Sequence, residues 1–276
     1  MKAELLLESS LKQLKLPCFA HSYQTLAQEA ARTNLSYERY LLALAQEEMA
    51  SRDAHRIERA ISQARFPTLK ELADFEWSSV PSVPKARILE LAQGAYIAKA
   101  EPVILLGNPG LGKSHVATGL ALAACRQSRR VRFYNAAGLV NDLIKAQQEY
   151  QLSRVMAQLG KLELLVLDEL GFIPFTQTGA QLLFQVCSAL YERVAVIITT
   201  NLRFAEWSTI MGGDERMSAA LLDRLTHRAT ILEFVGTSYR FRQQLQHQEL
   251  PVSEAKEPGA AEPVEVVNPG SSIHRR

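Results

Sequence analysis

The stretch that decides the fold runs from Val103 to Ser114 and reads VILLGNPGLGKS. Its first four residues are aliphatic, as in a strand that is buried on both faces of a parallel sheet. The remaining eight, Gly107 to Ser114, have the spacing Gly-x-x-x-x-Gly-Lys-Ser of a phosphate-binding loop. Glycines let such a loop turn tightly, so that consecutive backbone N–H groups can point at phosphate oxygens. A buried strand leading into this loop predicts a nucleotide-binding α/β domain that takes ATP.

The loop also supplies side chains for the nucleotide. Lys113 is expected to provide a cation to the β- and γ-phosphates, and the Ser114 hydroxyl is expected to coordinate Mg²⁺. The predicted cofactors are therefore ATP and Mg²⁺. The predicted nucleotide-binding residues of this segment are Gly107, Asn108, Pro109, Gly110, Leu111, Gly112, Lys113, Ser114 and His115.

Strands and helices alternate from about residue 85 onward. Besides Val103 to Leu106, short segments rich in aliphatic or aromatic residues predict strands at 131–134, 164–167, 194–199 and 230–234. Helices are predicted through Ala124, at 137–148 and at 180–192. This alternation predicts a parallel sheet that is covered by helices on both faces.

Four regions follow from composition and periodicity. Residues 1–65 form a predicted helical N-terminal domain, with Ser36 as an expected helix start. Residues 66–84 carry Pro67, Pro81 and Pro84 and are expected to be a linker. An ATPase domain is predicted over 85–249, and a disordered tail rich in Pro, Glu, Ala, Gly and Ser over 250–276.

Composition narrows the class of protein. Of the 276 residues, 47% are hydrophobic and 22% are charged, which is ordinary for a soluble globular chain. The formal net charge of +2 means that any nucleic-acid surface must be a local patch. Three scattered cysteines argue against a disulfide framework or a zinc site. No signal peptide or run long enough to cross a bilayer is visible, so we expect a cytoplasmic protein without a membrane partner.

Two carboxylates follow the third predicted strand. The run Leu164 to Leu167 ends in Asp168 and Glu169. Asp168 is expected to join Ser114 in holding the Mg²⁺ shell, and Glu169 to polarise the attacking water as a general base. The second carboxylate favours hydrolysis over phosphoryl transfer to a small molecule.

Polar and basic residues later in the chain complete the predicted site. Asn201 or Thr200, at the end of the fourth strand, is expected to orient the hydrolytic water. The alternative is that Asn201 only caps the segment that follows the strand. Arg224 is expected to reach a neighbouring subunit's γ-phosphate, with Arg228 as a rival for this role. Arg240 is expected to contact phosphate within its own subunit. Surface ion pairs are the alternative for these arginines.

Basic residues also cluster at two other places. One helix face carries Arg52, Arg56 and Arg59, and a second cluster contains Arg126, Arg129, Arg130 and Arg132. Either cluster is a possible DNA surface. For the first, an equally good reading is a solvated face that is paired with Glu47, Glu48, Asp53 and Glu58.

Taken in order, these elements resemble the AAA+ ATPases and, within them, the IstB-like proteins, over roughly residues 5–245. The residues that carry the resemblance are Ala64-Arg65-Phe66-Pro67, Asp74-Phe75, Leu167 to Phe172, Tyr191-Glu192-Arg193, Ile197 to Asn201, Ala205-Glu206-Trp207, Leu222 to Leu225 and Ser238-Tyr239-Arg240. The resemblance implies a five-stranded parallel sheet in the order 5-1-4-3-2 and a small helical N-terminal domain. The short stretch after the fifth strand departs from the full helical lid of AAA+ proteins, which weakens the assignment of Arg240.

The resemblance also implies a function. IstB-like proteins are ATP-dependent helpers of an insertion-sequence transposase, so we expect a homo-oligomer that assembles on non-specific duplex DNA and assists a partner transposase. Lys145 and Arg154 become further candidates for DNA contacts, because loader-type ATPases bind DNA in this region. Two alternatives remain: a DnaC-type replicative helicase loader, and a nucleotide-gated scaffold with little turnover.

Overall fold

The structure is a computed structural model that describes residues 2–236 and 238. Its strands are β1 (Val103–Gly107), β2 (Val131–Asn135), β3 (Leu164–Leu170), β4 (Ala195–Thr200) and β5 (Thr230–Phe234). Its helices are α1 (Lys2–Gln13), α2 (Pro17–Thr33), α3 (Tyr37–Ala64), α4 (Lys85–Ala92), α5 (Ala95–Ala98), α6 (Lys113–Arg126), α7 (Ala136–Gln148), α8 (Leu152–Leu159), α9 (Gln177–Leu190), α10 (Trp207–Ile210) and α11 (Glu215–Thr226). Short 3-10 turns lie at η1 (Leu72–Asp74), η2 (Trp77–Ser79) and η3 (Phe204–Glu206).

The five strands form one parallel sheet in the order β2-β3-β4-β1-β5. Read from the other edge, this is 5-1-4-3-2, so the predicted fold class is confirmed. In the sheet Val103 lies between Ile197 of β4 and Thr230 of β5. Because the strands are parallel, the loops after β1, β3 and β4 meet at one edge, which is where an open α/β sheet binds its ligand.

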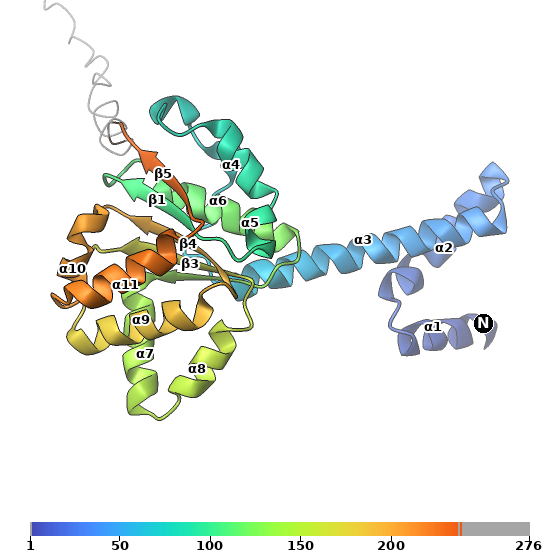
Figure 1. Cartoon of the computed structure of the whole chain (residues 1–276). Coiled ribbons are helices and arrows are strands. Elements are labelled where there is room, and N and C mark those ends of the chain that lie inside the picture. The colour runs from blue at the N-terminus through green and yellow to red at the C-terminus, as the bar shows by residue number, and fades with distance from the viewer. Residues whose placement is uncertain (1, 237, 239–276) are drawn as a thin grey trace, which may run out of the picture.

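Alternate residues of each strand pack into two separate cores. Val103 and Leu105 of β1 face α6, which lies with α4 and α5 on one side of the sheet (Figure 1). Ile104 faces the other side, which is covered by α7, α9 and α11 (Figure 1). This period of two, with apolar residues on both faces, is the pattern of a strand that is buried on both sides.

The long helix α3 joins the N-terminal helices to the sheet. It begins at the N-cap Ser36, whose hydroxyl accepts from the Arg39 N–H, as predicted. Its C-terminal end packs on α6 and β2, where Ala64 is fully buried. Its other half projects away from the sheet and carries α1 and α2 (Figure 1).

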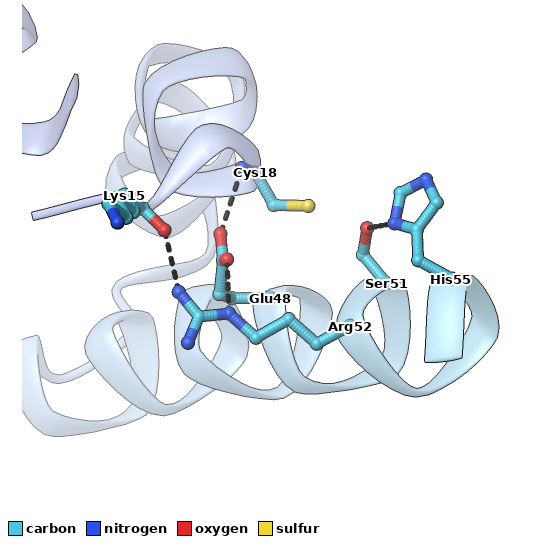
Figure 2. A network of polar contacts seen from close by, with 6 residues as sticks. All are labelled: Lys15, Cys18, Glu48, Ser51, Arg52 and His55. Carbon is cyan, nitrogen blue, oxygen red and sulfur yellow. Dashed lines mark hydrogen bonds and ion pairs between the residues drawn. The ribbon is translucent and has the colours of Figure 1, made fainter. Parts of the chain in front are cut away.

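Polar contacts fix the junction of α1 and α2 on α3 (Figure 2). The Glu48 carboxylate accepts from the Cys18 backbone N–H at 2.9 Å and from Arg52 Nε at 2.8 Å. Arg52 Nη2 also donates to the Lys15 carbonyl at 2.6 Å. Glu48 is only 4% exposed, so this ion pair is part of the packing of α3. Arg52 therefore has a structural role.

Several element boundaries differ from those expected from the sequence. Strand β3 continues through Asp168 and Glu169 to Leu170, with an irregularity in its pairing to β4 between Leu167 and Leu170. Helix α8 was not predicted, and Arg224 lies in the last turn of α11.

Residues 66–84, which were expected to be a linker, pack closely against the ATPase domain. Phe75, Val80 and Val83 belong to the same core as α6. Within the described part of the chain, no helix has the length and apolar character needed to span a membrane.

Candidate functional site

A cavity of about 500 Å³ lies at the carboxyl ends of β1, β3 and β4. Residues from three predicted motifs line it: the phosphate-binding loop, Glu169 and Asn201. Its walls also include a segment from the supposed linker. The lining residues are Lys70, Asp74, Phe75, Glu76, Ser79, Val80, Pro109, Gly110, Leu111, Gly112, Lys113, Ser114, His115, Glu169, Phe172, Thr199, Thr200 and Asn201.

The loop has the backbone geometry that its glycines allow. Gly107, Gly110 and Gly112 have φ values of 148°, 82° and 84°. A side chain at Gly107 would collide with the Phe234 carbonyl of β5. Lys113 is 8% exposed, and its Nζ donates to the carbonyls of Gly107 and Asn108 at 2.6 and 2.8 Å. The lysine cation therefore lies at the centre of the loop, which suits a polyphosphate ligand.

The segment before β1 closes directly on this loop. A Cβ atom at Gly112 would lie 2.5 Å from Cε2 of Phe75, so the aromatic ring covers the loop. Phe75 also meets the His115 imidazole edge-on, with ring centroids 5.3 Å apart. His115 Nε2 lies 2.7 Å from the Glu71 carbonyl oxygen. His115 thus lines the cavity while it also holds this segment on α6.

An ion pair fixes the same segment from outside. The Glu71 carboxylate accepts two hydrogen bonds from Arg126 of α6, one of them at 2.7 Å. These hydrogen bonds, with the nearby guanidinium charge, hold the pKa of Glu71 below its usual value despite an opposing effect of burial. The contact explains why Arg126, one of the four clustered arginines, does not project freely.

Asp168 is positioned by a residue that the sequence reasoning missed. Its Oδ1 accepts a 2.6 Å hydrogen bond from the Thr199 hydroxyl of β4. The same hydroxyl accepts from the Glu169 backbone N–H at 2.8 Å. Asp168 is 8% exposed and Thr199 is 1% exposed, so the arrangement is rigid. Buried polar groups are normally hydrogen-bonded, but only the pairing of β3 with β4 shows that the partner of Asp168 is Thr199.

Glu169 has both an unusual backbone and a side-chain partner. Its φ of 59° is in the left-handed region, which is uncommon for a residue with a side chain. The Asn135 side-chain amide donates to Glu169 Oε2 at 2.8 Å. Asn135 ends β2 and pairs with Asp168 in the sheet register. No sequence motif identified Asn135, because only the sheet order brings it next to Glu169.

The two polar residues at the end of β4, Thr200 and Asn201, have different surroundings. The Thr200 hydroxyl accepts from the Leu202 N–H at 3.1 Å, so it caps the turn. Asn201 follows the strand, is partly exposed and lines the cavity. Asn201 is therefore the better placed of the two for a water near the γ-phosphate.

The predicted arginines lie elsewhere. Arg224 donates to the Ala220 carbonyl at 2.7 Å and lies over the Phe184 ring at 5.2 Å. Arg224 and Arg228 line a second cavity and are not among the residues that line the nucleotide cavity. Arg240 lies outside the described residues.

The basic clusters are engaged in intramolecular contacts. Arg129 pairs with Glu163 at 2.9 Å, and Arg130 donates to the Lys161 carbonyl at 2.6 Å. Arg132 donates to the Gln63 carbonyl at 2.9 Å. On α3, Arg56 pairs with Asp53 and Arg59 donates to the His55 carbonyl. These contacts favour the structural reading of both clusters.

The two further candidates for DNA contacts, Lys145 on α7 and Arg154 on α8, are exposed. Lys145 lies 3.9 Å from Glu149, and both side chains are well exposed. Within the described residues we find no hydrogen bond or ion pair of the Arg154 guanidinium, which is exposed on α8. Arg154 is thus available for a partner.

The residues of the site fit ATP with Mg²⁺. Gly107, Gly110 and Gly112 give the loop the positive φ angles of a phosphate-binding turn, and the buried Lys113 cation lies against its backbone. Ser114 and Asp168 supply one hydroxyl and one carboxylate, and Mg²⁺ typically takes one or two carboxylates, waters and substrate phosphates.

Comparison with known proteins agrees with this geometry. Residues 9–247 match the family model described as IstB-like ATP binding protein. A Pseudomonas aeruginosa protein, named for ATP binding in insertion sequence IS21, is 36% identical over 237 residues, covering 86% of this chain and 89% of that protein. An insertion-sequence ATP-binding protein of Sinorhizobium fredii is 39% identical over 233 residues, covering 84% and 78%.

Among solved structures, DnaI superposes with a TM-score of 0.50 at 17% identity, covering 60% of this chain and 91% of that one. This similarity concerns the fold alone. The sheet order, the phosphate-binding loop and the match over most of the sequence lead to one conclusion. The chain belongs to the family of IstB-like ATP-binding proteins and has the AAA+ fold.

Proposed function

We propose that this protein is an ATPase that assembles on DNA when it binds ATP and that assists a partner transposase. The observation that carries the proposal is the common cavity of the phosphate-binding loop, Glu169 and Asn201, with Asp168 hydrogen-bonded to Thr199 of its wall. Family membership adds ATP as the nucleotide.

The side chains of the cavity support hydrolysis. Lys113 and the loop N–H groups bind the phosphates, and Ser114 and Asp168 would hold Mg²⁺, which neutralises phosphate charge. Asn201 orients a water in line with the γ-phosphorus, and Glu169 accepts its proton as the water oxygen attacks. The bond to the ADP oxygen breaks, giving ADP and inorganic phosphate. Asn135 holds the Glu169 carboxylate in place, and Thr199 holds that of Asp168.

An arginine for the transition state would come from a second copy. Among the described residues that line the cavity there is no arginine, although phosphoryl transfer commonly uses one. Arg224 is near the surface at the other end of the sheet and can serve a neighbour's site. The proposed active unit is therefore a homo-oligomer with its sites at the subunit interfaces.

DNA binding is expected to be independent of sequence. Arg154 and Lys145 are exposed on neighbouring helices and can contact phosphates. Such contacts release counterions, so affinity falls steeply as salt rises. The names of the relatives connect them to insertion sequences, which supports a transposase as the partner in the cytoplasm.

A steady-state ATPase assay with and without duplex DNA tests the proposal. We expect turnover that DNA stimulates, and ATP-dependent oligomers in sedimentation that are lost in Lys113→Ala. Binding of ATP without turnover would support the nucleotide-gated scaffold instead. A pull-down that captures a replicative helicase but not the transposase would support the helicase loader.

A further inference from the structure

The loop after β3 has an exposed apolar tip that the proposed chemistry does not use. It consists of Phe172 and Ile173, whose side chains are 67% and 55% exposed. They follow Glu169 by only three and four residues, and Phe172 forms part of the cavity wall. Two consecutive exposed apolar side chains at the mouth of a polar site are typical of a contact surface.

A second cavity, of about 290 Å³, lies at the opposite end of the sheet. It is bordered by the residues before β1, the end of α9, the start of β4 and the end of α11. Its base consists of buried apolar side chains, and its edge is charged. The base includes Cys187, Leu190, Val194, Val196 and Leu225, and the edge includes Lys99, Arg224 and Arg228.

We infer that the Phe172–Ile173 tip of one subunit docks into this second cavity on the next copy of the chain. The inference rests on the proposed ATP-dependent assembly and specifies its interface. Because tip and cavity are different surfaces, the contact is heterologous, and its repetition builds a ring or a helical filament.

The position of Arg224 supports this pairing. Phe172 lines the nucleotide cavity, and Arg224 lines the second cavity. When the tip of one subunit docks into the second cavity of its neighbour, the neighbour's Arg224 comes close to the ATP site beside the tip. Within the part of the chain that the structure describes, the guanidinium contacts the Ala220 carbonyl and the face of Phe184, so a change of rotamer can release it. The same contact thus buries the tip and completes the site.

Charge complementarity points to the same partner. Among the described residues, the nucleotide cavity is lined by three acidic residues, Asp74, Glu76 and Glu169, against Lys70 and Lys113. The second cavity has three basic residues, Lys99, Arg224 and Arg228, against Glu101 and Glu192. Bound ATP makes the first surface more negative. The two surfaces therefore attract each other more strongly when ATP is present, as an ATP-dependent interface requires.

The edge of the second cavity is also held in shape. The Tyr191 hydroxyl and His227 Nδ1 lie 3.0 Å apart and join the end of α9 to the residue after α11. His227 Nδ1 lies 3.8 Å from Glu192. Little rearrangement is needed for docking, which lowers its entropic cost.

Cross-linking between two proteins that each carry one introduced cysteine tests the docking. One protein carries Ile173→Cys and the other Lys99→Cys, both with Cys18→Ser. Burial raises the pKa of Cys125 to about 11 and that of Cys187 to about 12, so these thiols do not compete for a short bismaleimide. With ATP and duplex DNA, we expect the two-chain adduct only when both proteins are mixed. Assembled protein that gives no adduct overturns the docking.

Ile173→Asp provides a second, independent readout. Ile173 is not among the residues that line the nucleotide cavity, so ATP affinity should stay the same while ATP-dependent oligomers decrease at least tenfold. Tyr150→Asp, at a residue that is 96% exposed between α7 and α8, is the matched control and should assemble normally. If wild-type protein does not assemble with ATP, the proposed function and the docking both fail. If it assembles and Ile173→Asp assembles equally well, only the docking fails.

Discussion

Asn135 donates a 2.8 Å hydrogen bond to the Glu169 carboxylate and at the same time caps helix α7. Its amide nitrogen serves Glu169, and its amide oxygen accepts from the N–H groups of Ala137 and Gly138 at 3.1 and 3.4 Å. The proposed catalytic base is therefore tied to the start of the helix that follows β2.

Asn135→Asp separates these two roles. Aspartate caps a helix about as well as asparagine, so stability should change by less than about 0.5 kcal/mol. The new carboxylate cannot donate to Glu169 and repels it. We expect the kcat for ATP to fall about tenfold or more, within the range for a displaced general base. Asn141→Asp, at an exposed position of α7, is the control and should keep full turnover. An unchanged kcat in Asn135→Asp would mean that the contact does not serve catalysis.

Gly112→Ala tests the closed wall of the nucleotide site. The φ of 84° costs an alanine about 1–2 kcal/mol, and its Cβ would lie 2.5 Å from the Phe75 ring. We expect ATP affinity to fall at least tenfold in a fluorescence titration, with partial recovery in the double variant with Phe75→Ala. Gly138→Ala, where a Cβ would have no neighbour within 4 Å, should bind ATP normally. Equal affinity in Gly112→Ala and wild type would contradict this account of the loop.

Thr199→Val tests the support of Asp168. Valine keeps the shape of the side chain but leaves a buried carboxylate oxygen without its donor, at a cost of about 1–3 kcal/mol. We expect a higher Mg²⁺ concentration for half-maximal ATPase activity and a lower kcat. Thr199→Ser keeps the hydroxyl and should behave like wild type. A Mg²⁺ dependence that is the same in all three proteins would exclude this role for Thr199.

Much of the architecture could be predicted from local pattern. The aliphatic runs located all five strands, and the sheet order implied by the resemblance is the one found. Residues 109–114 of the loop, Glu169 and Asn201 line one cavity. Asn135, Thr199 and Phe75 could not be predicted in this way, because their roles depend on which strands are neighbours and on how the segment before β1 folds back.

Charge pattern alone was a poor guide to a DNA surface. The clustered arginines Arg129, Arg130 and Arg132 are held by a carboxylate or by backbone carbonyls. The sequence shows where basic residues cluster but not which of them already have partners. Arg154 was a candidate for DNA contacts only because of the family resemblance.

Salt dependence of DNA binding distinguishes these residues. We expect Arg154→Ala to weaken binding to any duplex and to lower the slope of log K against log salt by about 1, as loss of one phosphate contact would. Arg132→Ala should leave the slope unchanged and lower the thermal stability instead, since its guanidinium donates to Gln63 and packs over Tyr134. Identical slopes for Arg154→Ala and wild type would remove Arg154 from the DNA surface.

The central claim is that each ATP site takes its catalytic base from one subunit and its arginine from the next. The most direct measurement is the DNA-stimulated ATPase activity of Glu169→Gln and Arg224→Ala, each alone and then mixed in equal amounts. Each protein alone should be nearly inactive. In the mixture, some sites combine Glu169 from one protein with Arg224 from the other, so activity should reappear. A mixture that is no more active than its two components would contradict the shared site.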